Sequence, residues 1–445
     1  MVEVAGFRII KMKNRTFKII TLGCKVNQYE SAALKESLLG SGCSETSHGE
    51  DTDITIINTC IVTQRASYQS RQAIRKAQRE NPSGLTAAIG CYAQVYPDEL
   101  SSIEGIDLIA GNTVKDRLPD IILGPKDESN SLLSKDFKSD MPFQFLPIKR
   151  FLNRTRAFLK VQDGCQSFCS YCIVPFARGP LRSLDGASVI RELKSLSDEG
   201  YKEVVLTGIH LGKYGVDLKD APDLKNLLRL IGKEGFPFRI RLSSIEPNEI
   251  DRELIEMMAS EDWICRHFHI PLQSGDDGIL QKMNRSYTSR EFAGLIERIH
   301  ETIPLAAIGV DTMAGFPGED DRSFQNTHTM IQRLPISYLH VFPYSARKGT
   351  PASGFTGQID GKVIKDRAGR LRSLGHEKRM DFYRSCIGKS FFVLEEGWQS
   401  EENKMIKGLS DNYLPVTFPS PRLIKNKLVS VRIESLGEEG LTGSI

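Results

Sequence analysis

Three short apolar runs near the start of the chain, each followed by a cysteine, constrain its fold more than any other feature. The runs are residues 17–22, 54–57 and 85–89, and they lead to Cys24, Cys60 and Cys91. Apolar runs without polar alternation are typical of strands buried on both faces, as in a parallel sheet. Because open α/β sheets place their ligands at the carboxyl ends of the strands, we expect the three cysteines to converge.

The length of 445 residues exceeds what one hydrophobic core usually serves, so we expect several domains. We assign residues 14–124 to an N-terminal α/β domain. Its last two expected elements are residues 106–109 and 114–122. Residues 125–150 form a linker, 151–377 a core domain, and 378–445 a small all-β domain of alternating strands.

Composition narrows the class of protein. Apolar residues make up 40% of the chain, charged residues 26%, and the net charge is +3, which excludes a disordered chain or a fibre. No apolar run approaches the roughly 18 residues of a membrane helix, and no secretory signal is evident. Nine unevenly spaced cysteines do not suit a secreted disulfide scaffold, so we expect a cytoplasmic protein without a membrane partner.

The core domain alternates strand-like and helix-like segments. Expected strands are 157–162, 203–207, 238–243, 267–270, 305–311 and 338–342, with amphipathic helices such as 188–199 and 289–301 between them. Six β/α repeats favour a partial barrel over a closed eight-stranded one, which takes about 250 residues.

Cys165, Cys169 and Cys172 follow the first of these strands. Three cysteines this close together in a cysteine-poor chain indicate ligation of a soft metal by thiolates. Structural zinc usually takes four ligands, and no fourth Cys or His is near. Three thiolates on a four-iron cluster leave one iron open, so we favour an iron–sulfur cluster, with zinc or free thiols as the alternatives.

This cysteine spacing, placed before a β/α series, resembles that of the radical S-adenosylmethionine enzymes. Segments 159–165 and 173–179, the strand-end cysteines and the C-terminal β domain, which is similar to a TRAM domain, narrow the resemblance to the methylthiotransferases. Segments 21–27, 206–210, 243–247 and 340–351 are most similar to the branch that acts on N6-threonylcarbamoyladenosine in tRNA.

The resemblance implies an α/β fold with an N-terminal parallel sheet, a partial (β/α)6 radical barrel and a TRAM-like barrel. It also implies methylthiolation at C2 of the modified adenosine next to the anticodon, position 37. Two [4Fe-4S] clusters would serve this reaction. The catalytic one, on Cys165, Cys169 and Cys172, binds S-adenosylmethionine and generates a radical, and the one on Cys24, Cys60 and Cys91 carries the sulfur.

The implied partners are the tRNA anticodon stem-loop, an electron donor such as flavodoxin or ferredoxin, and a sulfur donor that the sequence does not identify. Alternatives are the same chemistry on isopentenyladenosine in tRNA or on an aspartate of a ribosomal protein, and a non-catalytic RNA-binding iron–sulfur protein.

Candidate S-adenosylmethionine contacts lie at the ends of the core strands. They are Thr207, Gly208, Ser243, Glu246, Gln273 and Asp311. Turns and caps explain the same residues equally well. We expect His267 and His269 to serve packing or hydrogen bonding, and Cys43, Cys265 and Cys386, which lack a strand-end setting, to serve packing.

Locally concentrated positive charge is the expected RNA signal, because phosphates respond to local potential rather than to the small net charge. One set is Arg65, Arg71, Arg75, Lys76 and Arg79; a second is Lys149, Arg150, Arg154, Arg156, Arg178 and Arg182. Phe342 and Tyr344 are candidates for stacking on an unpaired base. A solvated helix face would show the same pattern of charge.

Overall fold

The computed structural model describes residues 15–46, 52–124, 132–134, 136–138, 140–148, 155–424, 426–437 and 440–445. They form two compact units. The first contains the chain up to Asp140 together with Gln144–Ile148 and Phe176–Arg178; the second contains Met141–Phe143, Lys149–Pro175 and Gly179–Ile445. Three residues that follow the Cys165–Cys172 loop therefore belong to the first unit.

The first unit is built on a parallel sheet, as the apolar runs predicted. Its strands are β1 (Thr16–Thr21), β2 (Ser44–Glu45), β3 (Ile54–Thr59), β4 (Leu85–Gly90), β5 (Leu108–Ala110) and β6 (Leu132–Leu133), in the order β2-β1-β3-β4-β5-β6. Every residue of β3 is buried, as expected for a strand covered on both faces. Strand β6 extends the sheet within the segment predicted to be a linker.

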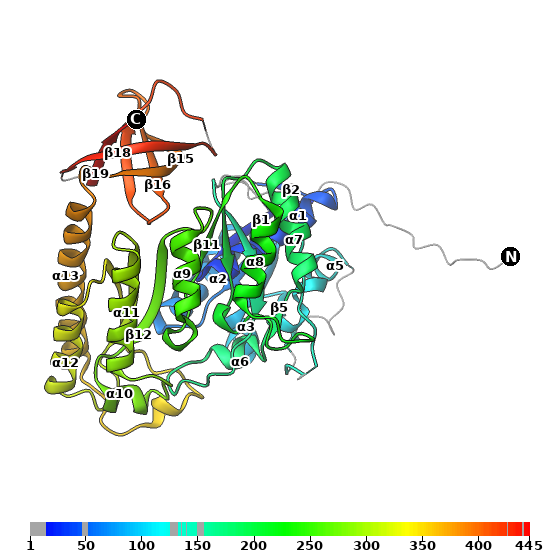
Figure 1. Ribbon diagram of the computed structural model, residues 1–445. Coiled ribbons are helices and arrows are strands. Elements are labelled where there is room, and N and C mark those ends of the chain that lie inside the picture. The colour runs from blue at the N-terminus through cyan, green and yellow to red at the C-terminus, as the bar shows by residue number, and fades with distance from the viewer. Residues whose placement is uncertain are drawn as a thin grey trace. The chain divides into compact units, whose positions relative to one another are not determined.

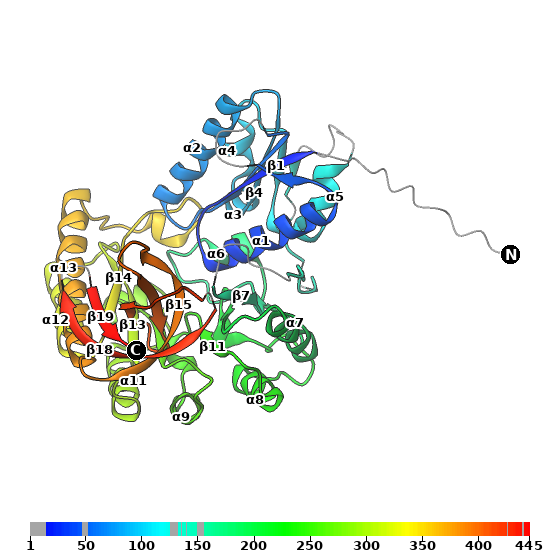
Figure 2. The same cartoon turned by 90° about the horizontal axis from the view of Figure 1, so that it is seen from above.

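Helices cover both faces of this sheet. They are α1 (Lys25–Gly40), α2 (Gln64–Glu80), α3 (Cys91–Val95), α4 (Pro97–Ser101), the 3-10 helix η1 (Asn112–Arg117) and α5 (Leu118–Leu123). Figure 2 shows α1 and α5 on one side and α2 on the other. Helix α2 begins where the side chain of Thr63 accepts a hydrogen bond from Ala66 N, a common N-cap arrangement.

The second unit contains the six core strands that the sequence predicted. They are β7 (Ala157–Lys160), β10 (Glu203–Thr207), β11 (Arg239–Leu242), β12 (His267–Gln273), β13 (Ala307–Ala314) and β14 (Tyr338–Pro343). They form two parallel sheets, ordered β11-β10-β7 and β12-β13-β14. A parallel bridge between Ile240 of β11 and Ile264, just before β12, links the two sheets. Short strands β8 (Gln162–Asp163) and β9 (Arg182–Ser183) pair antiparallel beside them.

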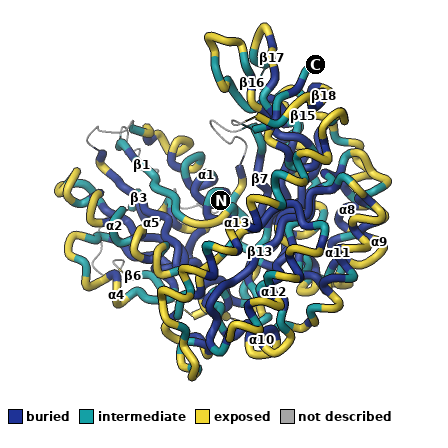
Figure 3. Tube along the Cα trace, turned by 90° about the vertical axis from the view of Figure 1, so that its left-hand side faces the viewer, coloured by how far each residue is buried: buried dark blue, intermediate teal, exposed yellow. Residues whose placement is uncertain are grey.

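Helices between these strands complete the β/α series, so the partial-barrel prediction is confirmed. They are α7 (Gly186–Asp198), α8 (Leu224–Glu234), α9 (Arg252–Ser260), α10 (Asp277–Lys282), α11 (Ser289–Thr302) and α12 (Asp321–Arg333), with 3-10 helices η3 (Leu211–Lys213), η4 (Pro247–Glu249) and η5 (Pro351–Gly354). Each helix from α7 to α12 has an Asp or Thr N-cap that accepts a backbone hydrogen bond. Figure 3 shows β7 and β13 buried and the outer helix surfaces exposed.

The long helix α13 (Gly361–Ser385) leads into a closed C-terminal barrel (Figure 1). Its strands are β15 (Ser390–Ser400), β16 (Met405–Ser410), β17 (Pro415–Pro419), β18 (Leu428–Gly437) and β19 (Gly440–Ser444), in the order β15-β16-β17-β19-β18. Val393, Ile406, Phe418 and Val431 fill its interior. Five strands closed on themselves agree with the predicted TRAM-like domain.

A buried ion group joins this barrel to the core strands of the same unit. Glu203 pairs with Arg239 and Arg241, each through a contact of 2.7 Å, and the two arginines donate to barrel-side carbonyls at 2.7–2.9 Å. Burial raises the pKa of Glu203, but the charges of Arg241 and Arg239 outweigh it and lower that pKa to about 2. The carboxylate is therefore ionised at neutral pH and holds both guanidinium groups in place.

Candidate functional site

The three strand-end cysteines of the first unit come together, as the sequence predicted. Cys24 follows β1, Cys60 follows β3, and Cys91 begins α3 directly after β4. The thiols of Cys24 and Cys60 both interact electrostatically with that of Cys91. Burial, reinforced by the charge of Cys91, raises the pKa of the Cys60 thiol to about 12. Cys24 is exposed to solvent, whereas the other two are buried.

Two glycines allow the strand ends to approach this closely. Gly23 has φ of +96°, and a Cβ atom there would lie 2.8 Å from Sγ of Cys60. Gly90 has φ of +94°, and its Cβ would lie 2.5 Å from Oδ1 of Asn58. Any other residue would be strained at both positions and would displace a neighbour. The Gly-Cys pairs in the sequence thus have a steric cause.

A buried group of charges lies beside these thiols. Nη1 of Arg178 lies 2.6 Å from Oε1 of Glu30, Nη2 contacts Oδ1 of Asn27 at 2.5 Å, and Lys115 pairs with the same glutamate. Burial raises the pKa of both Cys24 and Cys60, and the charge of Arg178 opposes this rise. Arg178 therefore makes anionic sulfur less unfavourable at this buried site.

The second cysteine set occupies the loop after β8 in the second unit. The N–H of Cys165 donates to Gly179 O at 3.0 Å, and the N–H of Cys172 donates to Cys169 O at 2.9 Å, so backbone hydrogen bonds shape the loop. The three thiols interact electrostatically with one another. Burial, with the charge of Cys169, raises the pKa of the Cys172 thiol to about 12.

Two side chains from other loops contact this set. Sγ of Cys165 lies 3.4 Å from Nδ1 of His210, whose Nε2 lies 2.8 Å from Oε1 of Glu249. Burial lowers the pKa of His210, but its hydrogen bonds to Cys165 and Glu249 raise it to about 10. Nη1 of Arg285 lies 3.2 Å from Sγ of Cys169. Sequence reasoning singled out neither residue, because no local pattern shows which distant cation will face a sulfur.

Each cysteine set supplies three thiolates, which are the ligands that iron–sulfur clusters take. Among the described residues, His269, Asp311 and His340 form a further group, whose ligand atoms all lie within 4.8 Å of one another.

The candidate S-adenosylmethionine contacts lie at or just after strand ends, except that Asp311 lies inside β13 rather than at its end, and two of them show signs of a ligand site. Oγ of Ser243 is buried without a hydrogen-bond partner among the described residues, as a ligand-facing hydroxyl would be. Gln273 has φ of +62°, a strained value for a residue with a side chain. Thr207 is buried at the end of β10, and a Cβ on Gly208 would lie 2.9 Å from Gln162.

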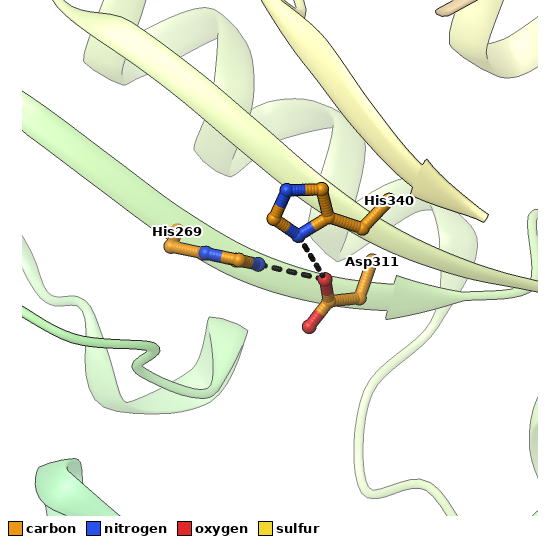
Figure 4. A group of neighbouring side chains, drawn as sticks. All are labelled: His269, Asp311 and His340. Carbon is orange, nitrogen blue, oxygen red and sulfur yellow. Dashed lines mark hydrogen bonds and ion pairs between the residues drawn. The ribbon is translucent and has the colours of Figure 1, made fainter. Parts of the chain in front are cut away.

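The other two candidates are engaged by protein groups. Glu246 pairs with Arg285, and burial raises the pKa of its carboxyl. Oδ1 of Asp311 lies 2.7 Å from Nε2 of His269 and 3.3 Å from Nδ1 of His340 (Figure 4). Burial raises the pKa of Asp311, but the hydrogen bonds from both imidazoles hold it well below its usual range. His269 is thus a hydrogen-bonding residue, as expected, whereas sequence reasoning did not single out His340.

The expected RNA contacts separate into exposed and buried groups. On α2, Arg65, Arg75, Lys76 and Arg79 are exposed, while Arg71 donates to the hydroxyl of Tyr92. Arg178 and Arg182 are buried, so the structure contradicts the prediction that Arg178 offers its guanidinium to a phosphate. Phe342 is 40% exposed, but Tyr344 is buried against Phe316 and does not present a stacking surface. Lys149, Arg150 and Arg154 lie outside the described residues.

Comparison with known proteins identifies relatives along nearly the whole chain. Residues 16–111 match the family described as Uncharacterized protein family UPF0004, and residues 159–331 match the Radical SAM superfamily. The threonylcarbamoyladenosine tRNA methylthiotransferase MtaB of Bacillus subtilis is 39% identical over 94% of this chain and 93% of its own length. The MtaB of Aquifex aeolicus is 39% identical over 89% and 95%. A tRNA-2-methylthio-N(6)-dimethylallyladenosine synthase of Alkaliphilus oremlandii is 31% identical over 97% and 93%.

Solved structures support the fold alone. The radical S-adenosylmethionine methyltransferase TsrM of Kitasatospora setae, with tryptophan and a SAM analogue bound, matches with a TM-score of 0.55 at 17% identity, over 76% of this chain and 75% of its own. In the part of the chain that the structure describes, no helix is long and apolar enough to span a membrane.

Proposed function

The chain belongs to the radical S-adenosylmethionine methylthiotransferases, and we propose that its substrate is N6-threonylcarbamoyladenosine next to the anticodon of tRNA, which it methylthiolates at C2. The observation that carries this choice of substrate is the identity of 39% with two MtaB relatives, against 31% with the dimethylallyladenosine synthase of Alkaliphilus oremlandii. Members of this family use two [4Fe-4S] clusters and S-adenosylmethionine, and the two cysteine sets supply thiolates for both.

We assign the cluster that binds S-adenosylmethionine to Cys165, Cys169 and Cys172. Its chemistry when bound is the generation of a radical able to attack an aromatic C–H bond, which no side-chain base can deprotonate at neutral pH. The protein supplies the hydrogen bonds to sulfur from His210 and Arg285, which orient the ligands and tune the cluster.

We assign the second, sulfur-carrying cluster to Cys24, Cys60 and Cys91. Burial raises the pKa of Cys60 to about 12 although Arg178 opposes the rise, so at neutral pH this thiol stays protonated until a metal displaces the proton. We assign the binding of S-adenosylmethionine to the predicted candidates that include Ser243, whose hydroxyl is unpartnered among the described residues, and Gln273.

RNA binding is assigned to the exposed cations of α2 and to Phe342. Arg65, Arg75, Lys76 and Arg79 project from the unit that carries the second cysteine set. Contacts of this kind make affinity depend on salt, because each neutralised phosphate releases counterions. The expected partners are the anticodon stem-loop of tRNA, an electron donor such as flavodoxin or ferredoxin and an unidentified sulfur donor, in the cytoplasm.

Nucleoside mass spectrometry tests the substrate. Digested tRNA from a strain that lacks the gene should lose 2-methylthio-threonylcarbamoyladenosine and retain 2-methylthio-isopentenyladenosine, and the wild-type gene should restore the former. Unaltered methylthio-threonylcarbamoyladenosine would refute the assignment, and loss of the isopentenyl product would support the second substrate, on which the Alkaliphilus relative acts.

An in vitro assay separates an enzyme from a binding protein. Anaerobically reconstituted protein should cleave S-adenosylmethionine and modify an anticodon stem-loop carrying threonylcarbamoyladenosine. Absence of cleavage with both clusters loaded would favour the alternative of a non-catalytic RNA-binding protein. Modification of a ribosomal protein instead of RNA would favour an enzyme that acts on a ribosomal-protein aspartate.

A further inference from the structure

Three side chains of types that bind metal ions meet on one face of the sheet β12-β13-β14. His269 of β12, Asp311 of β13 and His340 of β14 come from adjacent parallel strands. Asp311 and His340 pair directly in the register of the sheet. His269 lies two residues before Pro271, the partner of Asp311 on β12, and residues two apart share a face of a strand. The strand order therefore brings together three residues that are far apart in the sequence.

The ligand atoms of this group are close enough to share one ion. Oδ1 of Asp311 lies 2.7 Å from Nε2 of His269 and 3.3 Å from Nδ1 of His340, and all three atoms lie within 4.8 Å of one another (Figure 4). Nitrogen and oxygen atoms bonded to one tetrahedral zinc ion at about 2.0–2.1 Å are about 3.3 Å apart. The longer contact already has this separation, and the shorter one has to open by only about 0.6 Å.

The donor set is one that divalent transition metals take. Two imidazoles and one carboxylate are the protein ligands of known kinds of zinc site. In the structure, the two nitrogens that face Asp311 donate hydrogen bonds to its ionised carboxylate. A divalent ion takes the lone pairs of these nitrogens, and each neutral ring then carries its proton on its other nitrogen, so no charged imidazole is required.

The group is enclosed on one side and open on the other. The side chains of His269 and Asp311 are 13% and 19% exposed, whereas that of His340 is 47% exposed. The buried ring of Tyr338 lies 6.2 Å from the ring of His269 and 5.3 Å from that of His340. In the part of the chain that the structure describes, no fourth His, Cys, Asp or Glu meets the same distance. An ion here therefore keeps a position open for an oxygen ligand such as water.

We propose that His269, Asp311 and His340 bind one divalent transition-metal ion, such as Zn²⁺, with an open coordination position. The group belongs to the second unit, and it uses none of the cysteines. The hydrogen bonds to Asp311 hold both imidazoles in place before the ion binds, which lowers the entropic cost of binding. Structural zinc is closed by four protein ligands, whereas zinc with three protein ligands binds a further water or substrate.

The zinc content of the anaerobically reconstituted holoenzyme tests this site. Its cysteine sets are then occupied by clusters and do not compete for zinc. After incubation with zinc and removal of free metal by gel filtration, wild type should retain one zinc ion per chain, measured by inductively coupled plasma mass spectrometry. His340→Leu and Asp311→Asn should each lose this zinc, because two ligands remain in place of three. Asp311→Asn keeps the shape and an acceptor oxygen, so it separates metal binding from hydrogen bonding.

X-ray absorption at the zinc edge identifies the ligands. The first shell should contain nitrogen and oxygen at about 2.0–2.1 Å and no sulfur at about 2.3 Å. Zinc should also raise the unfolding temperature of wild type and not that of Asp311→Asn, since an ion that binds only the folded state stabilises it.

A matched variant and the iron content serve as controls. His300→Gln replaces an exposed histidine on α11 and should retain the same zinc as wild type. Every variant should contain as much iron as wild type, which shows that it folds and loads its clusters. No zinc in wild type, equal zinc in wild type and Asp311→Asn, or a shell of sulfur would each overturn the inference.

Discussion

Replacing Glu30 with Gln tests the buried charge group of the first unit. The carboxylate of Glu30 is shared by Arg178 and Lys115, and all three residues are at most 3% exposed. Gln has nearly the same shape, so the change removes charge without opening a cavity. Removing one partner of a buried ion pair costs about 3–5 kcal/mol, and here the lost carboxylate pairs with two cations. We expect a destabilisation in that range for this unit.

Hydrogen exchange measured by mass spectrometry localises the effect. Peptides that cover β3 and β4 report the opening of the sheet in the first unit, independently of unfolding elsewhere. Since about 1.4 kcal/mol is a factor of ten, exchange of their slowest amides should accelerate by about 10²–10⁴-fold. Peptides from β12 and β13 in the second unit should change little.

Two control variants isolate the role of burial. Glu256 pairs with Arg252 on the surface of α9, and Glu256→Gln should cost less than about 1 kcal/mol. Adding Lys115→Met to Glu30→Gln removes one of the two cations that had paired with Glu30 and should recover part of the lost stability. A Glu30→Gln effect no larger than that of Glu256→Gln, or no recovery in the double variant, would refute the reasoning.

Three further predictions concern the strand-end cysteines, the buried ion group of Glu203 and the exposed cations of α2. The Cys24→Ala, Cys60→Ala, Cys91→Ala triple variant should keep about half of the iron of wild type after anaerobic reconstitution, because it retains one cluster; full iron content would contradict the assignment. Glu203 has a lowered pKa of about 2, so it contributes stability above pH 4.5 that is lost as pH falls toward 2. Glu203→Gln should reduce this loss of stability at acid pH. The fluorescence of Trp398 in the barrel reports unfolding as the pH is lowered. Arg75→Glu should weaken tRNA binding and reduce the slope of log affinity against log salt by about 1, whereas an unchanged slope would remove α2 from the interface.

The sequence predicted those parts of the fold that depend on local pattern. Apolar runs such as 54–57 identified the strands, since a strand buried on both faces must be apolar throughout. The cysteines after these runs could be placed together because parallel strands end at one edge of a sheet. Strand β6 was missed because two residues, Leu132 and Leu133, are too few to show any periodicity.

Long-range partners could not be predicted in the same way. Arg178 is followed closely by Arg182 in the sequence, and together they resembled a phosphate-binding patch. The structure buries both, and the carboxylate that pairs with Arg178 lies 148 positions earlier in the chain. A run of cations shows that charge is present, but only the fold shows whether an anion has been brought to it.

Whether the fold supplies a protein partner for a polar group also decides whether that group can bind a ligand. A buried charge whose hydrogen bonds are already satisfied by the protein, such as that of Arg241, stabilises the fold and is closed to a substrate. His340 differs, because Asp311 engages one of its nitrogens and fixes the ring while half of the side chain remains exposed. A side chain that is already oriented beside open space is preorganised for binding, since ordering it costs little further conformational entropy. For this reason a fixed and half-exposed side chain such as His340, rather than the buried guanidinium groups, is open to a ligand.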